Sequence, residues 1–299
     1  MMNPVLSICI VTYKVRDLLK DCLDSIYQNP PEAPFEIIIV DNHSEDGTRE
    51  LVQAAYPGVR FVEMEKNEGY TLPMNRALKM GRGKYLVQLN PDTIVYPGAF
   101  DTLICFMESH PEAGICTPKV LNRDGTLQKQ CRRSEAGPWD AITYFTGLAR
   151  RFPNDPRFAG YLMTYLDENE VNEVKAVSGS CMFMRRTAVE ETGYLDETFF
   201  AYQEDADFCF RARQKGWKIY YVPQAQIVHF GGQGGSGVEV YRSIYEWHRS
   251  YFIYYRKHLA KRYFFLLNWF FYGLMAGKLL LNLAVTLLRK EKYAGTRKP

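Results

Sequence analysis

The chain has 299 residues, of which 46% are hydrophobic. This is enough to bury a substantial core, as one large domain with an appendage or as two smaller domains. Its seven cysteines are scattered without a C-x-x-C pair, which argues against a disulfide framework or a zinc cluster and favours a reducing compartment. The N-terminus lacks the positive and apolar regions of a secretory signal, so a cytosolic location is expected.

Charge is distributed unevenly along the chain. The net charge is +3, but residues 241–299 carry 12 Lys or Arg against 2 Asp or Glu, whereas the preceding residues carry 25 basic and 32 acidic side chains. A basic end after an acidic body predicts an anionic partner, either a lipid surface or a nucleic acid. No nucleic-acid partner is expected, because the basic residues flank an apolar segment.

The first 120 residues alternate between strand-like and helix-like patterns. Apolar runs typical of buried parallel strands cover 6–12, 35–40, 59–64 and 85–89. Helical patterns follow them over 16–27, 44–56, 72–80 and 99–108. This order predicts an α/β fold with a doubly wound, mostly parallel, Rossmann-like sheet and helices on both faces.

Beyond residue 122 the pattern loses this rhythm. Glycine and proline residues interrupt 123–172, which predicts an irregular insertion with some helix. Ordered elements resume afterwards, with strand-like patterns, a helix start and a Gly-rich stretch at 176–184, 204–207, 217–222 and 231–237. We therefore expect a first domain over residues 1–238 and a helical, basic and apolar, membrane-associating C-terminal region over 239–299.

Polar side chains follow the predicted strands at the points where they end. Tyr13 follows the first strand, Asp41 and Asn42 the second, and Asp92 the fourth. In doubly wound sheets, ligands bind outside the carboxyl ends of the strands. The sequence therefore predicts that these side chains converge on one site.

Short motifs run in order from Leu6 to His229. They are Val11-Thr12-Tyr13, Val40-Asp41-Asn42 with Ser44, Asp46 and Gly47, Asn67-Glu68-Gly69 and Asn75, Asn90-Pro91-Asp92, Gly179-Ser180-Cys181-Met182-Phe183, Asp196-Glu197, and Glu204-Asp205-Ala206-Asp207 with Arg211, Gly216-Trp217 and His229. Each motif alone is weak, but the ordered set is specific. It resembles the inverting family-2 glycosyltransferases with the GT-A fold, particularly the bacterial rhamnosyltransferase-like branch.

A divalent metal, Mg²⁺ or Mn²⁺, is expected at Asp92. A nucleoside diphosphate gains negative charge as the sugar–phosphate bond breaks, and an acidic body needs a cation to stabilise that charge. Asp92 stands at a strand end, and the resemblance implies His229 as the second ligand. Relatives usually have Asp-x-Asp here, whereas this chain has Asn90 in place of the first Asp. Taken alone, Asp92 also suits a turn and His229 an ordinary loop or core histidine.

Two adjacent acids suit the chemistry of sugar transfer. Inverting transfer needs a general base to take the proton from the acceptor hydroxyl. Glu204 and Asp205 stand at a predicted helix N-terminus, whose dipole favours an ionised carboxylate. The resemblance implies Asp205 as the base. The alternative is that these acids only stabilise the first turn of the helix.

The resemblance also implies where donor and acceptor bind. The asparagine, glycine and strand-end residues expected to bind the nucleotide are Thr12, Tyr13, Asp41, Asn67, Gly69, Asn75 and Asn90. Asp41 can accept a hydrogen bond from the imide N–H of uracil or thymine, which suits a pyrimidine base. The resemblance to rhamnosyltransferases implies dTDP-rhamnose as the donor, with UDP-hexoses next. The residues expected to contact the acceptor are Gly179, Ser180 and Trp217.

Residues 263–288 are almost wholly apolar. Lys278 divides them into uncharged stretches of about 15 and 10 residues, each below the ~18 expected for a spanning helix. On a helix, one face collects Asn268, Lys278, Asn282, Thr286 and Arg289. This favours a peripheral or monotopic helix on an anionic membrane, at the cytoplasmic face of the inner membrane. The alternatives are a helix packed on the body or on a second copy in a homo-oligomer, and a true span if Lys278 faces protein.

These features predict metal-dependent sugar transfer from a nucleotide-sugar to a hydroxyl of a glycan or lipid-linked acceptor in cell-surface polysaccharide synthesis. One alternative is a non-catalytic, membrane-associated nucleotide- or glycan-binding scaffold that lost the full Asp-x-Asp. Another is a nicotinamide-dependent dehydrogenase, which is disfavoured because no G-x-G-x-x-G follows the first strand.

Overall fold

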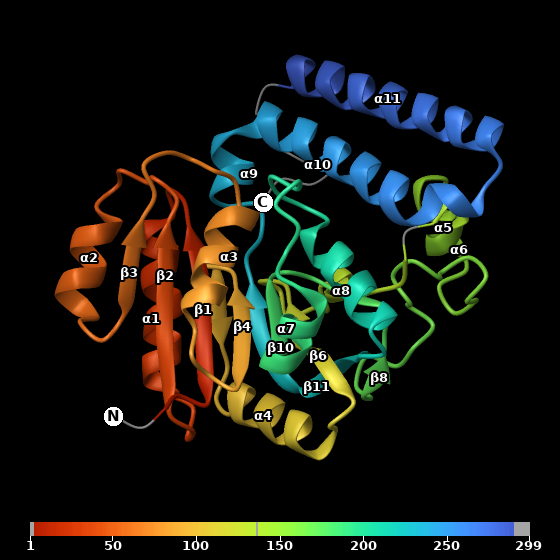
Figure 1. Ribbon diagram of the computed structural model, residues 1–299. Coiled ribbons are helices and arrows are strands. Elements are labelled where there is room, and N and C mark those ends of the chain that lie inside the picture. The colour runs from red at the N-terminus through yellow and green to blue at the C-terminus, as the bar shows by residue number, and fades with distance from the viewer. Residues whose placement is uncertain (1–2, 136, 290–299) are drawn as a thin grey trace.

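A mixed sheet of nine strands forms the centre of the computed structural model, which describes residues 3–135 and 137–289 (Figure 1). The strands lie in the order β3–β2–β1–β4–β10–β6–β11–β5, and β8 pairs with β11 beside this path. Their bounds are β1 (Leu6–Thr12), β2 (Phe35–Asp41), β3 (Arg60–Glu63), β4 (Tyr85–Leu89), β5 (Thr93–Val95), β6 (Ala113–Leu121), β8 (Asn172–Glu173), β10 (Cys181–Arg185) and β11 (Lys218–His229).

The half of the sheet formed by β1 to β4 is parallel, which confirms the predicted α/β class. β1 pairs in parallel with β2 and with β4, and β2 pairs in parallel with β3. All seven residues of β1 are buried, as expected for a strand covered on both faces. The connecting helices are α1 (Arg16–Gln28), α2 (Thr48–Ala55) and α3 (Thr71–Met80), and α4 (Ala99–Ser109) follows β5.

The other half of the sheet changes direction at β10. This strand lies antiparallel to β4 on one side and to β6 on the other. The sequence patterns missed β6 and ended β11 at Val222. β6 contains Pro118, which lies opposite Val222 where the register between β6 and β11 shifts. Proline inside a strand is tolerated at such irregularities. The sequence pattern is interrupted there, although β6 and β11 are each continuous.

Residues 123–172 form short elements joined by turns. They include η1 (Lys129–Cys131), β7 (Arg132–Arg133), α5 (Pro138–Phe145) and α6 (Leu148–Arg151). β7 pairs with β9 (Ala176–Val177) in a separate two-stranded ribbon. Arg132 fastens the segment by donating to the carbonyl oxygens of Asp167 and Leu166, both at 2.8 Å. The ribbon is placed beside α8 (Glu204–Gln214), which follows α7 (Arg186–Thr192).

The last helices pack on the body of the protein. α9 (Gly235–Val238) leads into α10 (Val240–Tyr254), a π-helical turn covers Tyr255–Leu259, and a 3-10 turn covers Ala260–Arg262. α11 (Phe265–Leu288) then runs back along α10 on the side away from the sheet (Figure 1). Glu239, one residue beyond the expected domain boundary, accepts hydrogen bonds from Tyr13 and Asn67. The C-terminal region therefore begins inside the packed body.

The polar side chains of α11 share one face, and that face contacts protein. Asn268 accepts a hydrogen bond from the Tyr255 hydroxyl at 2.6 Å, and Asn282 Nδ2 lies 3.0 Å from His248 Nε2. Lys278 Nζ lies 3.2 Å from the ring centre of Phe145, and burial lowers the pKa of this ammonium to about 8. By length and composition α11 could cross a membrane, and its apolar side chains point outward.

Candidate active site

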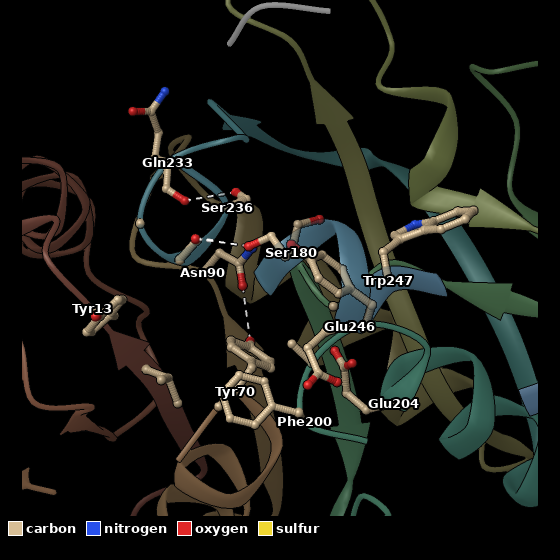
Figure 2. A pocket seen from close by; sticks show the side chains of 18 of the residues that line it. Tyr13, Tyr70, Asn90, Ser180, Phe200, Glu204, Gln233, Ser236, Glu246 and Trp247 are labelled. Carbon is tan, nitrogen blue, oxygen red and sulfur yellow. Dashed lines mark hydrogen bonds between the residues drawn. The ribbon is translucent and has the colours of Figure 1, made fainter. Parts of the chain in front are cut away.

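A cavity of about 390 Å³ lies at the carboxyl ends of the parallel strands. Tyr13 follows β1, Asn42 follows β2 and Asn90 follows β4, and all three line the cavity. The start of α8 and one side of α10 form the opposite wall, so that Tyr13 and Trp247 lie on opposite sides (Figure 2). This is the position at which doubly wound sheets bind ligands.

Asp92 and His229 face each other in this cavity. β5 starts directly after Asp92 and pairs antiparallel with the end of β11, which places His229 opposite Thr93. His229 Nε2 lies 3.3 Å from Asp92 Oδ1, and the Gly231 N–H donates to Asp92 Oδ2 at 2.9 Å. Burial raises the pKa of Asp92, but a protonated His229 ring, which donates to the carboxylate and carries a positive charge, and the Gly231 N–H outweigh burial and leave the pKa below its usual value.

A second hydrogen bond orients the His229 ring. Nδ1 lies 2.8 Å from Gln128 Oε1, and because an amide oxygen only accepts, Nδ1 carries the proton. In the neutral ring, Nε2 then presents its lone pair to the cavity, where Asn90 Nδ2 lies 3.1 Å away. A lone pair and a carboxylate oxygen this close repel each other unless a cation or a proton lies between them.

A divalent cation fits this pair of donors. Carboxylate and imidazole are ligands for such ions, and Mg²⁺ commonly takes only one or two carboxylates together with substrate phosphates. Across residues 3–135 and 137–289, no group of three or more His, Cys, Asp or Glu side chains is arranged to hold a metal. The described residues thus offer two ligands here, Asp92 and His229, and a diphosphate and water are needed to complete a coordination shell.

The N-terminus of α8 brings Glu204 and Asp205 into the cavity. Tyr202 and Gln203 precede the helix in the left-handed backbone conformation, with φ angles of 67° and 64°. This conformation is strained for residues other than glycine and recurs at functional sites. Both acids are buried and line the cavity, so the turn directs them inward.

Hydrogen bonds hold the Asp205 carboxylate in place. Its Oδ2 accepts from Arg133 Nη2 at 2.7 Å and from the Gly179 N–H at 2.8 Å. Its Oδ1 accepts from the Ala206 N–H at 2.6 Å. A buried carboxylate with a charged partner and two amide donors has a well-defined orientation.

Arg133 reaches Asp205 from the irregular segment. Its position depends on the pairing of β7 with β9, and its Nη2 also donates to the Val177 carbonyl oxygen at 2.8 Å. Sequence reasoning missed this residue. The available signal is the pair Arg132-Arg133 within a polar stretch, which does not reveal a buried partner far away in the chain.

Glu204 differs from its neighbour in lacking an ion pair. Its Oε2 is buried and has no hydrogen-bond partner among the described residues. Burial, and then the charge of Asp205, raise the pKa of Glu204 to about 8. Near neutral pH it is therefore largely a neutral acid that faces the cavity (Figure 2).

Asparagines and a glycine shape the wall on the side of Tyr13. Asn42 Nδ2 donates to Asn67 Oδ1 and to the Gly69 carbonyl oxygen, both at 2.8 Å. Gly69 has a φ of +83°, and a Cβ atom there would lie 2.3 Å from the carbonyl oxygen of Phe200. Only glycine fits this position without displacing the segment that leads to α8.

Three predicted nucleotide-binding residues lie behind the cavity wall. Thr12 is fully buried. The Asp41 carboxylate accepts from the Ser44 hydroxyl and from the Ser44 N–H, the latter at 2.9 Å, and burial raises its pKa. Asn75 donates to the Leu195 carbonyl oxygen at 2.8 Å. These side chains support the wall and do not line the cavity.

The predicted acceptor residues separate into two places. Gly179 and Ser180 line the cavity, and the Ser180 carbonyl oxygen accepts from the Asn90 N–H at 3.0 Å. Trp217 lies at the opposite end of β11 from His229, where its indole N–H donates to Glu191 at 3.0 Å. Its prediction as an acceptor contact was wrong in placement, because β11 is long enough to separate its two ends.

The wall formed by α10 escaped the sequence predictions. Arg242, Ser243, Glu246 and Trp247 line the cavity, although this helix was assigned to the membrane-associating region. The signal was present as polar side chains at helical spacing within an aromatic segment. The Gly-rich stretch before α9 also borders the cavity, through Gly232, Gly234 and Gly235 among others.

The chain has curated relatives over most of its length. Residues 7–193 match the family model described as Glycosyl transferase family 2. An N-acetylglucosaminyl-diphospho-decaprenol L-rhamnosyltransferase of Mycobacterium tuberculosis is 30% identical over 242 residues, covering 76% of this chain and 76% of that protein. A low-salt glycan biosynthesis hexosyltransferase of Haloferax volcanii is 27% identical, covering 75% of this chain and 66% of that protein.

Solved structures share the fold at lower identity. A mannosyltransferase from Pyrobaculum calidifontis, in complex with GDP-Man and Mn²⁺, aligns with a TM-score of 0.58 and 16% identity over 88% of this chain and 66% of that chain. TarS of S. aureus aligns with a TM-score of 0.53 and 17% identity over 82% of this chain and 64% of that chain. The chain therefore belongs to glycosyltransferase family 2 and is a glycosyltransferase with the GT-A fold.

Proposed function

We propose that the protein transfers a sugar, with inversion, from a nucleotide-sugar to a hydroxyl of a glycan or lipid-linked acceptor in cell-surface polysaccharide synthesis. The observation that carries this proposal is the sharing of one cavity by the pair Asp92–His229 and the pair Glu204–Asp205. The first pair suits a cation beside a diphosphate, and the second suits proton transfer from a hydroxyl.

Asp92 and His229 would hold the divalent metal. When bound, Mg²⁺ or Mn²⁺ neutralises charge that develops on the diphosphate leaving group. Asn90 lies between these ligands and Tyr70, whose hydroxyl donates to Asn90 Oδ1 at 3.0 Å. Its Oδ1 accepts from Tyr70 as a carboxylate oxygen would, while its Nδ2 faces His229 and adds no second negative charge.

Asp205 would act as the general base. The acceptor oxygen attacks the anomeric carbon from the side opposite the diphosphate, its proton passes to the Asp205 carboxylate, and the sugar–phosphate bond breaks with its electron pair going to the diphosphate. Arg133 and the Gly179 amide fix the orientation of that carboxylate. Glu204 is largely neutral near pH 7, so its carboxyl O–H can donate a hydrogen bond to an oxygen of the sugar acceptor.

The sugar and the acceptor are proposed from the relatives and from the wall residues. The rhamnosyltransferase of Mycobacterium tuberculosis supports transfer of rhamnose onto a lipid-diphosphate-linked acceptor, and we propose dTDP-rhamnose as the donor. The Mn²⁺ in the mannosyltransferase complex supports a divalent metal. Tyr13, Asn67 and Gly69 would contact the nucleotide, and Gly179 and Ser180 the acceptor. The exposed helix α11 supports a place at the cytoplasmic face of the inner membrane.

Thermal stabilisation by ligands tests the donor site. Purified protein is heated with dTDP, UDP or GDP, each with and without Mn²⁺, and specific binding raises Tm because it stabilises the folded state alone. We expect a metal-dependent shift with a pyrimidine diphosphate, followed by turnover with the matching nucleotide-sugar. No shift with any nucleotide, together with no turnover, would favour the non-catalytic scaffold.

A further inference from the structure

We propose that α11 and the α5–α6 segment together form one docking face for a lipid bilayer. The docking face comprises the outward side chains Trp269, Phe270, Leu280 and Leu281 of α11 with Ile142 and Phe145 of α5. Trp269 is 71% exposed and Leu280 is 67% exposed, while Phe145 is 54% exposed. Contiguous apolar surface of this kind marks a protein or membrane contact. The proposal concerns a surface and does not depend on the proposed chemistry.

The polarity of α11 is inverted relative to that of an ordinary surface helix. Its polar side chains Asn268, Lys278 and Asn282 contact protein, and Thr286 is buried. A helix at the surface of a water-soluble domain directs such side chains to solvent and its apolar side chains to the core. α11 does the opposite, as expected for a helix whose outer surroundings are hydrocarbon.

Two contacts join the α5–α6 segment to the C-terminal helices. Lys278 Nζ of α11 lies 3.2 Å from the ring centre of Phe145 of α5 and 4.6 Å from that of Trp247 of α10. At the other end, Arg262 Nη1 lies 2.7 Å from Glu135 Oε2 just before α5. These contacts therefore hold the apolar side chains of α11 and of the α5–α6 segment in one surface. The docking face is thus formed by both elements and not by α11 alone.

Charge favours a bilayer over a second copy of the chain. The turn before α11 carries four exposed basic residues, Arg256, Lys257, Lys261 and Arg262. Lys257 forms ion pairs with Asp196 and Asp207 and Arg262 with Glu135, so Arg256 and Lys261 contribute most of the outward positive charge. Between residues 241 and 289 the only acid is Glu246, which lines the cavity. Basic side chains beside an apolar face attract anionic headgroups, whereas a second identical face offers no acidic partner for them.

The docking face also explains the placement of the cavity. Trp247 lines the cavity and contacts Lys278 of α11, so a single helix, α10, separates the cavity from the docking face. Packed helix axes lie roughly 10 Å apart. The cavity thus lies within roughly one helix diameter of the proposed bilayer surface, close to where a bilayer-anchored acceptor would be.

Vesicle co-sedimentation of the full chain tests this proposal. Vesicles of phosphatidylcholine, with or without phosphatidylglycerol, separate apolar from electrostatic binding. Leu280→Glu and Ile142→Glu each put a charge on the docking face, and each is expected to weaken vesicle binding about tenfold or more. Val171→Glu is the matched control, at a position of 41% exposure outside the docking face, and should bind like the parent.

Quenching of tryptophan fluorescence by brominated lipid gives a readout that needs no substitution. Trp269 of the docking face is 71% exposed, and Trp139, on α5 about one helical turn before Ile142, is 52% exposed. We expect brominated lipid to quench the fluorescence of both. Parent-like vesicle binding of Ile142→Glu would overturn the two-element surface. Absence of quenching would overturn bilayer contact.

A lipid-free dimer of the parent that Leu280→Glu converts to monomer, without vesicle binding by the parent, would assign the face to a second copy and overturn the proposal. Nucleotide-dependent stabilisation of Leu280→Glu, measured in the same preparation, shows whether the variant is folded. It also separates a failure of docking from a failure of the donor site.

Discussion

Arg133 Nη2 and Asp205 Oδ2 lie 2.7 Å apart in a buried ion pair that joins the irregular insertion to the helix carrying the proposed base. The pair makes the insertion part of the active site. Its ribbon of β7 and β9 holds the guanidinium where Asp205 needs a partner. Substitutions that disturb the insertion should therefore change the orientation of the Asp205 carboxylate.

Arg133→Met should damage both stability and turnover. Removing one partner of a buried ion pair leaves an uncompensated charge and costs about 3–5 kcal/mol. Denaturant unfolding measures that loss, and kcat should fall because Asp205 loses its orientation. Arg133→Lys keeps the charge and should recover part of both, whereas a Met variant with parental kcat would show that the ion pair does not position the base.

Asp205→Asn should abolish most turnover and keep donor binding. A positioned general base contributes about 100- to 10,000-fold in rate, and the amide keeps the shape of the carboxylate. Glu204→Gln, which keeps a hydrogen-bonding side chain, should lose no more than about tenfold, the value of one hydrogen bond. Steady-state kinetics measure kcat for both variants. A larger loss of kcat in Glu204→Gln than in Asp205→Asn would assign the base to Glu204.

Glu204 should make stability fall as pH rises. Its pKa is about 8 in the folded state against an ordinary value of 4.5, so the unfolded chain releases its proton first. The stabilising contribution is complete below about pH 4.5 and is lost progressively up to about pH 8. Comparison of Tm against pH for the parent and Glu204→Gln isolates the pH-dependent contribution of Glu204 to stability, because the glutamine at position 204 does not titrate. Parallel curves would contradict the raised pKa.

Asp92→Ala and His229→Ala should each remove the Mn²⁺-dependent part of nucleotide stabilisation. With ligand one hundredfold above Kd, binding contributes about 2.7 kcal/mol, and the parent should show it as a Tm shift. Asp17→Ala is the control, since this surface carboxylate has an 84% exposed side chain and does not line the cavity. A metal-dependent shift that survives in both cavity variants would place the metal elsewhere.

The parallel half of the fold follows from sequence patterns alone. β1 reads as an unbroken apolar run and forms as predicted, because a strand buried on both faces needs no alternation. Of the polar residues at strand ends, Tyr13, Asn42 and Asp92 line one cavity as expected, whereas Asp41 lies behind its wall. The pairing of β5 with β11 that delivers His229 is long-range and leaves no local trace.

The remaining site residues depend on tertiary contacts that local patterns do not contain. Arg133 is recognisable only once β7 pairs with β9, and the α10 wall only once that helix packs over the cavity. The polar stripe of α11 was correctly placed on one face, but its direction depends on Phe145, Trp247 and His248, which come from other helices. Helical periodicity shows which side chains share one face of a helix, but it does not show what that face packs against.

The antiparallel strand β10 has a consequence for the order of folding. It separates β4 from β6 in the sheet, so β4 is an unpaired edge until residues 181–185 have been synthesised. Such an edge is open to wrong pairing with another chain. Residues next to both of these paired strands line the cavity, Asn90 directly after β4 and Ser180 directly before β10. During synthesis the catalytic centre is therefore among the last parts of the molecule to exist.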